Sequence, residues 1–398
     1  MPKQTRVVVI GGGYAGVMAA NRLTRRADLT VTVFNPRPTF VPRLRLHQLA
    51  AGTHDGIVDY GEVLTGSARL VVEAVERIDA AERVVVAASG GRTDYDFLVY
   101  AAGSTGAGAE VPGVARFAHS VATLEAAQRL RSVLADTPTT AAVTVVGGGP
   151  TGIETAAELA GRGRRVTLLC GGVLGPYLHP RARRTALGYL GRAGVTVLDG
   201  AGTEVTAVTG EAVRLADGRE LPSRVTVWTA GFGVPDLAAR SGLSVDAAGR
   251  LITDETLTSV DDERIVAAGD SAAPSDLPFR MSAYAAGCLG AHAADTVLHR
   301  LAGEEPTPVD LSFPAMCLSF GRGAGIFQIG RKDDTATRLY VPGRAGALLK
   351  EVSCRASVRH LAHEARKPGS HSWPGGAHRR QLLRDADSRA RDVAERRG

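Results

Sequence analysis

The chain is poor in the residues that build disulfide frameworks and metal sites. Its 398 residues include four cysteines, which have neither a CxxC arrangement nor the spacing of a metal site. Residues 1–6 lack the apolar stretch of a secretory signal, so free thiols predict a cytoplasmic location. No apolar run is long enough for a membrane span. We therefore expect no transmembrane segment and at most a peripheral contact with the inner face of a membrane.

Aromatic residues are also scarce, at 5% of the chain, and no nucleic-acid-binding motif accompanies the net charge of +6. Dispersed arginines usually form a soluble surface, although a pI near 9.3 would also suit an acidic protein partner. Hydrophobic residues make up 44% of the chain, which is enough for two or three cores. The composition predicts a soluble protein without a nucleic-acid partner and leaves a homodimer open.

Glycine, in contrast, is abundant, and one glycine pattern occurs twice. Residues 7–16 read VVVIGGGYAG and residues 143–152 read VTVVGGGPTG. Each copy follows a β-branched run and opens a predicted helix, over residues 14–26 and 151–162. In such a unit the first glycine permits a tight turn, the second lets the backbone approach a pyrophosphate, and the third allows close helix–strand packing. Two dinucleotide sites are therefore predicted, and their contact residues are Gly11, Gly13, Tyr14, Ala15 and Gly16 in the first and Gly147, Gly149, Pro150, Thr151 and Gly152 in the second.

Both units lack the acidic residue that normally binds the adenosine ribose at the end of the second strand. Asn35 stands there in the first unit, where it can still bond a hydroxyl group, and Cys170 stands there in the second. Cys170 reads as a small buried hydrophobic residue. Without a carboxylate to repel a 2′-phosphate or an arginine to attract one, the sequence leaves NADH and NADPH open.

Three further strand-like segments end in small residues or a carboxylate. They are residues 93–104 with Ala102 and Gly103, residues 225–232 with Ala230 and Gly231, and residues 264–271 with Gly269 and Asp270. Together with the two glycine units, these segments resemble the pyridine nucleotide-disulfide oxidoreductase superfamily. Within it they are most similar to type II NADH dehydrogenases and apoptosis-inducing-factor-like flavoproteins. The resemblance runs from about residue 7 to residue 299.

The resemblance implies an α/β fold with two Rossmann-like, three-layer dinucleotide-binding domains, as in glutathione reductase, and a small C-terminal α+β region. An FAD-binding domain would comprise residues 1–115 and 236–310, with an NAD(P)H-binding domain inserted at 116–235. Residues 311–398 would form an interface region with β-like stretches at 311–331 and 338–349, followed by a charged tail that reads as a solvated helix. In addition to the glycine-unit residues, the predicted contacts are Asn35, Arg43, Ala102, Gly103, Gly269, Asp270 and Tyr284 for FAD, and Glu154, Ala230 and Gly231 for NAD(P)H.

No catalytic residue is certain from the sequence, and the candidates are Glu154, Arg43 and Tyr284. Arg43 could stabilise charge on reduced flavin or be a solvated surface residue, and His47 could relay a proton or be structural. The superfamily places a helix after the last strand, here predicted at 290–301, that points at the flavin. Type II NADH dehydrogenases carry two glutamines near its start, where this chain has Tyr284 and Cys288.

The resemblance also limits the chemistry. Residues 41–49 lack the CxxxxC pair of the disulfide reductases, which argues against disulfide reductase activity. Sulfide:quinone oxidoreductases use widely separated cysteines, so Cys288 and Cys317 leave that activity as an alternative. We expect an FAD-dependent NAD(P)H oxidoreductase that passes a hydride from nicotinamide to flavin and then electrons to a second acceptor. A quinone is favoured as that acceptor. The alternatives are a reductase of a ferredoxin- or rubredoxin-type protein and an apoptosis-inducing-factor-like flavoprotein with slow turnover.

Overall fold

The computed structural model describes residues 4–106, 110–376 and 378–395. The first glycine unit lies in a five-stranded parallel sheet with the strand order β21-β9-β1-β2-β5. Its strands are β1 (Thr5–Ile10), β2 (Leu29–Asn35), β5 (Ala68–Val72), β9 (Phe97–Tyr100) and β21 (Ile265–Ala267). Helix α1 (Tyr14–Leu23) connects β1 to β2, because parallel neighbours require a crossover. Val7 and Val9 of β1 pack into the core beneath α1, and Val8 packs into the core on the other face of the sheet.

The second glycine unit repeats this arrangement in a sheet with the order β11-β18-β12-β13-β14, again parallel throughout. Its strands are β11 (Ala118–Ser120), β12 (Ala142–Val146), β13 (Arg165–Leu169), β14 (Thr196–Leu198) and β18 (Val225–Trp228). Its helices are α5 (Leu124–Ala135), α6 (Pro150–Gly161) and α7 (Pro180–Arg192). The mixed α/β fold with two parallel sheets confirms the predicted fold class, whereas the domain boundaries at 115/116 and 235/236 stay a prediction.

Smaller elements complete each unit. An antiparallel sheet adjoins each parallel one, formed by β6 (Val75–Asp79), β7 (Val84–Ala87) and β8 (Arg92–Asp94) in the first unit and by β15 (Val205–Val208), β16 (Ala212–Leu215) and β17 (Glu220–Pro222) in the second. The strand pairs are β3 (Thr39–Phe40) with β4 (Val58–Asp59), β10 (Thr105–Gly106) with β19 (Phe232–Gly233), and β20 (Leu251–Thr253) with β22 (Ala272–Pro274). The short helices are η1 (Arg43–Arg45), α2 (Leu46–Ala50), α3 (Tyr60–Val63), α4 (Val114–Phe117), α8 (Leu237–Arg240) and η2 (Gly269–Ser271).

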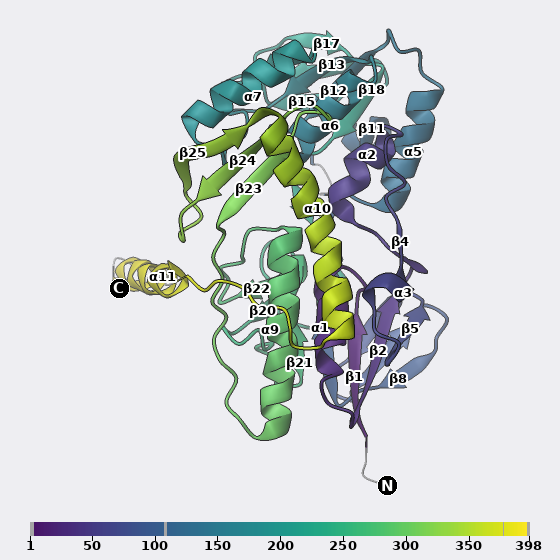
Figure 1. Ribbon diagram of the computed structural model, residues 1–398, viewed down its shortest axis with the longest axis vertical. Helices are drawn as coiled ribbons and strands as arrows, with labels where there is room; N and C mark the ends of the chain where they lie inside the picture. Colours follow the sequence, from purple (N-terminus) through teal and green to yellow (C-terminus); the bar gives the residue numbers. More distant parts are fainter. Residues whose placement is uncertain (1–3, 107–109, 377, 396–398) are drawn as a thin grey trace.

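The C-terminal region differs from its prediction. Strands β23 (Ala315–Ser319) and β24 (Gly325–Gly330) lie in the first predicted β-like stretch, and β25 (Ala336–Pro342) completes an antiparallel sheet with them. The second stretch, 338–349, was wrong beyond Pro342, because helix α10 (Gly343–Arg366) begins there. Figure 1 shows α10 crossing the centre of the molecule, from this sheet to the side of α1. It therefore lies where the two nucleotide-binding units meet.

The helix predicted at 290–301 is longer than expected. Helix α9 spans Ala283–Ala302 and begins where the Ser282 hydroxyl accepts a hydrogen bond from the Ala285 backbone N–H at 3.1 Å. Both Tyr284 and Cys288 therefore lie inside the helix. Helix α9 packs lengthwise against α1 (Figure 1), and a Cβ at Gly290 would overlap the Ala15 backbone. Gly290 thus permits the close approach of the two helices.

The charged tail contains helix α11 (His378–Glu395), but one residue of its first turn is not solvated as predicted. Arg379 is buried and donates to Glu255 at 2.7 and 2.8 Å. Residues 1–3 of the predicted FAD-binding domain and 396–398 of the tail lie outside the described residues.

Within the described parts of the chain, no helix is both long and apolar enough to cross a membrane.

Candidate active site

The first glycine turn has one open position between two packed ones. Gly11 has a φ of +101°, and a Cβ there would overlap the carbonyl oxygen of Ala101. A Cβ at Gly16 would overlap the carbonyl oxygen of Gly11, whereas one at Gly13 would meet no atom within 4 Å. Gly11 and Gly16 are therefore fixed by packing. Gly13, at the N-terminus of α1, faces open space where unpaired N–H groups can receive an anion.

The second glycine turn repeats this geometry. Gly147 has a φ of +125°, and a Cβ at Gly152 would overlap the carbonyl oxygen of Gly147. A Cβ at Gly149, before helix α6, would again meet no atom within 4 Å. Pro150 and Thr151 form the first turn of α6, so Tyr14 and Ala15 have counterparts in the second unit. Both turns thus leave room for a phosphate at the same glycine.

Side chains hold the first turn in place. The Asn35 side-chain oxygen accepts a hydrogen bond from the Gly12 N–H at 3.1 Å, and the Tyr60 hydroxyl donates to the Gly12 carbonyl at 2.7 Å. The Asn35 amide also donates to the Arg37 carbonyl at 2.9 Å. Asn35 thus shapes the glycine turn, a role that sequence reasoning missed together with Tyr60.

Several predicted FAD contacts lie at the carboxyl edge of the first sheet. Ala102 and Gly103 follow β9, and Gly269 and Asp270 follow β21, the strand that pairs with β9. Gly103 has a φ of +72° and no atom within 4 Å of a hypothetical Cβ, while Gly269 packs closely against Ala15. The sheet edge therefore has free space at Gly103, after β9, whereas α1 fills the space at Gly269, after β21.

Arg43 and Asp270 are joined through a third residue. The Ser104 hydroxyl donates to Asp270 Oδ2 at 2.6 Å, and Arg43 Nη1 donates to the Ser104 oxygen at 2.8 Å. The direct distance from Arg43 Nη1 to Asp270 Oδ2 is 3.8 Å. The Arg43 side chain is 33% exposed, so it is half-buried and not a solvated surface residue. Sequence reasoning named Arg43 and Asp270 but not Ser104.

Glu154 lies in a buried polar cluster. Its Oε1 lies 2.9 Å from Lys350 Nζ and accepts the Ser319 N–H at 2.9 Å, and its Oε2 lies 4.0 Å from His47 Nδ1. None of the Glu154, Lys350 and His47 side chains is more than 9% exposed. The cluster joins α6, α10, β23 and α2. The His47 Nε2 atom has no hydrogen-bond partner among the described residues.

The charges in this cluster follow from burial and pairing. Burial alone would raise the pKa of Glu154, but the Lys350 ammonium and His47 outweigh it, and the pKa lies below its usual value. Burial likewise disfavours charged Lys350, yet Glu154 raises the lysine pKa above its usual value. Burial lowers the pKa of His47 despite the carboxylate nearby. At neutral pH the cluster is thus a carboxylate, an ammonium and a neutral imidazole.

Lys350 was not found from the sequence, although there was a signal. The chain has four lysines in all, and Lys350 follows the apolar run Ala347-Leu348-Leu349. A lysine in such a place is rarely buried unless it is paired. The partner could not be named, because Glu154 is distant in the sequence.

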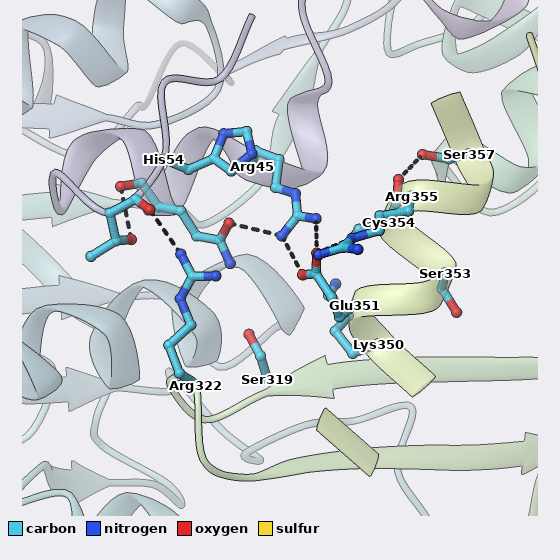
Figure 2. A network of polar contacts seen from close by, with 12 residues as sticks. Arg45, His54, Ser319, Arg322, Lys350, Glu351, Ser353, Cys354, Arg355 and Ser357 are labelled. Atoms are coloured by element: carbon cyan, nitrogen blue, oxygen red, sulfur yellow. Dashed lines mark hydrogen bonds and ion pairs between the residues drawn. The ribbon is translucent and has the colours of Figure 1, made fainter. Parts of the chain in front are cut away.

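A second polar contact ties α10 to the first unit. Arg45 donates to both carboxylate oxygens of Glu351 at 2.7 and 2.8 Å, and Arg355 Nε donates to the same carboxylate at 2.8 Å (Figure 2). Arg45 also donates to the Gln48 side chain at 3.0 Å. The Arg45 hydrogen bond holds the pKa of Glu351 at about 2. Helix α10 is thus held from both units.

Tyr284 is part of the first turn of α9, and its ring meets Phe313 edge-on at 6.1 Å. It is 37% exposed, while Cys288, one turn later, is buried with its Sγ 3.9 Å from His371 Nε2. The chemistry of the cysteines follows from burial. Burial raises the pKa of the Cys288 thiol to about 12, so the thiol is protonated at neutral pH. Cys317 lies on β23, and the described residues show no contact between it and Cys288; both cysteines are free. Free cysteines give no support to a disulfide exchange at this place.

In the second unit, Ala230 and Gly231 follow β18 next to the glycine turn. The hydroxyl of Thr229 donates to the Val146 carbonyl at 2.7 Å and lies near Gly147, and the Trp228 indole N–H donates to the Ala230 carbonyl at 2.9 Å. Gly231 has a φ of +80°. This segment therefore lies at the same sheet edge as the second turn, as Ala102 and Gly103 do in the first unit.

Comparison with known proteins agrees with this geometry. Residues 5–288 match the pyridine nucleotide-disulphide oxidoreductase family. The chain belongs to this family. It is therefore an oxidoreductase, as predicted, and its family confirms the resemblance noted from the two glycine units.

Two related sequences and one solved structure indicate which kinds of oxidoreductase the chain is similar to. An NADH dehydrogenase-like protein of Mycobacterium tuberculosis is 35% identical over 303 residues, which cover 68% of this chain and 73% of the relative. The type II NADH:quinone oxidoreductase Ndh of the same organism is 27% identical over 352 residues, covering 77% and 74%. The solved sulfide:quinone oxidoreductase of Aquifex aeolicus matches with a TM-score of 0.74 and 21% identity, covering 90% of this chain and 92% of that one. The last likeness shows the fold.

Proposed function

We propose that the protein is an FAD-dependent NAD(P)H oxidoreductase that passes electrons to a quinone. When bound, FAD would supply the two-electron step between the nicotinamide nucleotide and the acceptor. The observation that carries the proposal is the pair of glycine turns, each at the carboxyl edge of its own parallel sheet and each with open space at the second glycine. The relatives named as NADH dehydrogenases support the same reading.

The residues of the first unit fit FAD. The open face at Gly13 and the N-terminus of α1 would receive the pyrophosphate, and Asn35 keeps one oxygen near the adenosine end of the turn. Asp270, held by Ser104, would accept hydrogen bonds from the ribityl or phosphate region. Arg43 would place a positive charge near the ring, and Tyr284 would lie at the N-terminus of α9, whose dipole favours negative charge there.

The second unit would hold the nicotinamide nucleotide. Gly149 and the first turn of α6, Pro150 and Thr151, would contact its pyrophosphate, as Gly13 does in the first unit. Ala230 and Gly231 would border it at the end of β18. Glu154, predicted as a nicotinamide contact, is instead engaged by Lys350 and Ser319, so we assign it to the buried polar cluster.

A quinone accepts protons as well as electrons, and the buried cluster suits that requirement. Lys350 carries a proton within 2.9 Å of Glu154, and neutral His47 follows at 4.0 Å with an unpartnered Nε2 atom. A neutral imidazole can release a proton from Nε2 to an acceptor oxygen while Nδ1 takes one from the Glu154 carboxyl group, which receives its own from the Lys350 ammonium. We therefore assign proton delivery to Lys350, Glu154 and His47.

The test compares two acceptors. The flavin-loaded protein is reduced anaerobically with NADH and then mixed with a soluble quinone or with ferricyanide, which accepts electrons without protons. Wild type should reoxidise rapidly with both. His47→Gln should slow the quinone reaction by about 10²-fold, in line with the loss of a proton-transfer group, and leave ferricyanide unaffected. The matched control is His363→Gln, an exposed histidine on α10. Wild type that fails to reduce any quinone contradicts the proposal.

One observation favours a protein acceptor as a second candidate. Arg181, Arg184 and Arg192 on α7 border a shallow hollow of about 420 Å³ together with Tyr340 of β25. None of the three arginines forms an ion pair with a residue that the structure describes. A basic hollow of this kind suits an acidic electron-transfer protein. Reoxidation by such a protein that weakens steeply with salt, together with no reaction with quinone, would favour this candidate.

A further inference from the structure

The adenosine end of the second nucleotide site lacks its usual acid, and the residue in its place is chemically neutral. Cys170 directly follows β13 and packs against the glycine turn, since a Cβ at Gly148 would lie 2.9 Å from the Cys170 Cβ. Burial raises the pKa of this thiol to about 12, and the neighbouring Asp199 carboxylate adds to the shift. A neutral thiol neither attracts a ribose hydroxyl strongly nor repels a phosphate. Discrimination must therefore come from a neighbour.

The next strand supplies a carboxylate at the same sheet edge. Strands β13 and β14 are parallel, with Leu169 opposite Leu198, and the Cys170 N–H donates to the Leu198 carbonyl at 2.9 Å. Asp199 follows directly, so its backbone lies beside Cys170. The Asp199 side chain is exposed and has no hydrogen-bond or ion-pair partner among the described residues. The acid absent from the end of β13 is thus present one strand further along.

The loops around this point add more negative charge. The Gly200 N–H donates to the Gly172 carbonyl at 2.5 Å, and a Cβ at Gly171 would lie 3.9 Å from the Glu204 Cα. Gly172 has a φ of +135° and no atom within 4 Å of a hypothetical Cβ, so the loop has an open side. The exposed Glu204 carboxylate is also unpaired among the described residues.

The arginine in this neighbourhood is already engaged. Asp217 packs against Gly202, where a Cβ would lie 3.0 Å from the Asp217 Cβ, and it pairs with Arg219 at 2.7 Å. The pair is exposed and locally neutral. Two unpaired carboxylates, those of Asp199 and Glu204, therefore set the charge at the adenosine end of the site.

We propose that Asp199, assisted by Glu204, makes the second site selective for NADH over NADPH. A carboxylate can accept hydrogen bonds from the ribose hydroxyl groups of NADH, whereas the 2′-phosphate of NADPH brings negative charge towards two uncompensated anions. The inference rests on the proposed function, because it needs a nicotinamide nucleotide at this site. It assigns the donor that the motifs alone left open.

The experiment measures binding and turnover separately. Calorimetric titration with ADP-ribose and with its 2′-phosphate derivative reports the adenosine end alone, and anaerobic flavin reduction by NADH and NADPH reports the full donor. Wild type should prefer the form without the 2′-phosphate by on the order of 100-fold in both measurements, since the 2′-phosphate would meet charges of its own sign. Equal affinity for the two ligands would overturn the inference.

Variants then show which carboxylate disfavours the 2′-phosphate. Asp199→Ser should shift the preference at least about tenfold towards the 2′-phosphate ligand, and Glu204→Gln should shift it less, as its side chain lies on the next loop. Asp199→Asn keeps the size of the side chain and guards against a folding defect in Asp199→Ser. The control is Glu220→Gln, a carboxylate of β17 that pairs with Arg214 and is 58% exposed. A preference that is unchanged in both Asp199 variants would also overturn the inference.

Failure of the proposed function gives a different result. In that case neither NADH nor NADPH bleaches the flavin, while calorimetry still shows the preference for unphosphorylated ADP-ribose and its loss in Asp199→Ser. That result supports the inference on Asp199 and contradicts the proposed dehydrogenase activity.

Discussion

Lys350 and Glu154 form an ion pair with an Nζ–Oε1 distance of 2.9 Å, and neither side chain is more than 9% exposed. Burying two charges is costly unless their geometry is good and the remaining polar atoms are satisfied. Here the Ser319 N–H donates to the same carboxylate. The pair fixes α10 to the second unit, and the Arg45–Glu351 contact fixes it to the first (Figure 2). The position of α10 between the units is thus set by charge pairing at two consecutive residues, Lys350 and Glu351.

Replacing one member of the buried pair should be worse than replacing both. Lys350→Met leaves Glu154 without its counter-charge, and we expect the free energy of unfolding to fall by about 3–5 kcal/mol. The double variant Lys350→Met/Glu154→Gln should recover much of that loss, because no buried charge remains. Urea unfolding monitored by circular dichroism measures both. A double variant less stable than Lys350→Met would contradict this account.

A substitution at the second glycine of the first turn should impair FAD binding without impairing folding. Gly13→Ala adds a methyl group that meets no protein atom within 4 Å, so the free energy of unfolding should change by about 1 kcal/mol or less. FAD should nevertheless be lost, because the methyl group enters the space for the pyrophosphate. Flavin absorbance per protein measures this loss.

Gly16→Ala is the matched contrast to that variant. Its methyl group would overlap the Gly11 carbonyl, so it should destabilise the fold itself by about 1–3 kcal/mol. Gly149→Ala and Gly152→Ala form the same pair for the nicotinamide nucleotide. A Gly13→Ala protein that purifies with full flavin would show that the open position is not the phosphate site.

The parts of the fold that the sequence predicted are those whose signal is local. A phosphate-binding turn needs glycines at fixed offsets between a strand and a helix, so both turns could be located from adjacent residues. Asp270 could be found in the same way, as a carboxylate directly after a buried strand. Asn35 ends β2, as the sequence predicted, but its hydrogen bond to Gly12 joins the end of β2 to the turn after β1. The role of such a side chain depends on pairing that the local pattern does not contain.

Helix α10 and the start of α9 were missed for a tertiary reason. Glycine is unfavourable inside helices. The Gly343-Arg344 pair therefore read as a break in a β-like stretch, and the helix of α9 was predicted only from Gly290 onwards. In the structure a Cβ at Gly346 would come within 2.5 Å of the Gly325 carbonyl oxygen, and one at Gly290 would overlap Ala15. These glycines let a helix approach a strand or another helix closely. Packing outweighs propensity at these positions, and it could not be read from either segment alone.

The Arg45–Glu351 contact predicts a specific acid sensitivity. The Arg45 hydrogen bond lowers the pKa of Glu351 from 4.5 to about 2, so the contact stabilises the fold fully above pH 4.5 and is lost as the pH falls towards 2. Glu351→Gln should lower the free energy of unfolding at pH 7 by about 1 kcal/mol and flatten its decline between pH 5 and pH 3. Urea unfolding across that range tests this, with Glu263→Gln as an exposed control. Parallel pH profiles for wild type and Glu351→Gln would contradict it.

The lowered pKa of His371 predicts a second loss of stability, at higher pH than the loss due to Glu351. Burial, together with the neighbouring His360 ring 5.3 Å away between centroids, lowers the pKa of His371 to about 4. Arg22 acts in the same direction, while Glu364 opposes it. A histidine that is neutral in the folded state favours folding above its unfolded pKa of 6.5. That contribution is lost as the pH falls from 6.5 through 4, because the unfolded chain takes up the proton first.

Removing this titration should therefore make the protein less sensitive to mild acid. His371→Phe keeps a ring against Trp373, whose centroid lies 6.0 Å from that of His371, but cannot be protonated. We expect its free energy of unfolding to fall less than that of wild type between pH 6.5 and pH 4, as measured by urea unfolding at fixed pH values. His363→Phe, at an exposed position on α10, should keep the wild-type slope. If His371→Phe declines as steeply as wild type, the acid sensitivity in this window arises from other buried histidines, of which His47 and His292 also have lowered pKa values because of burial.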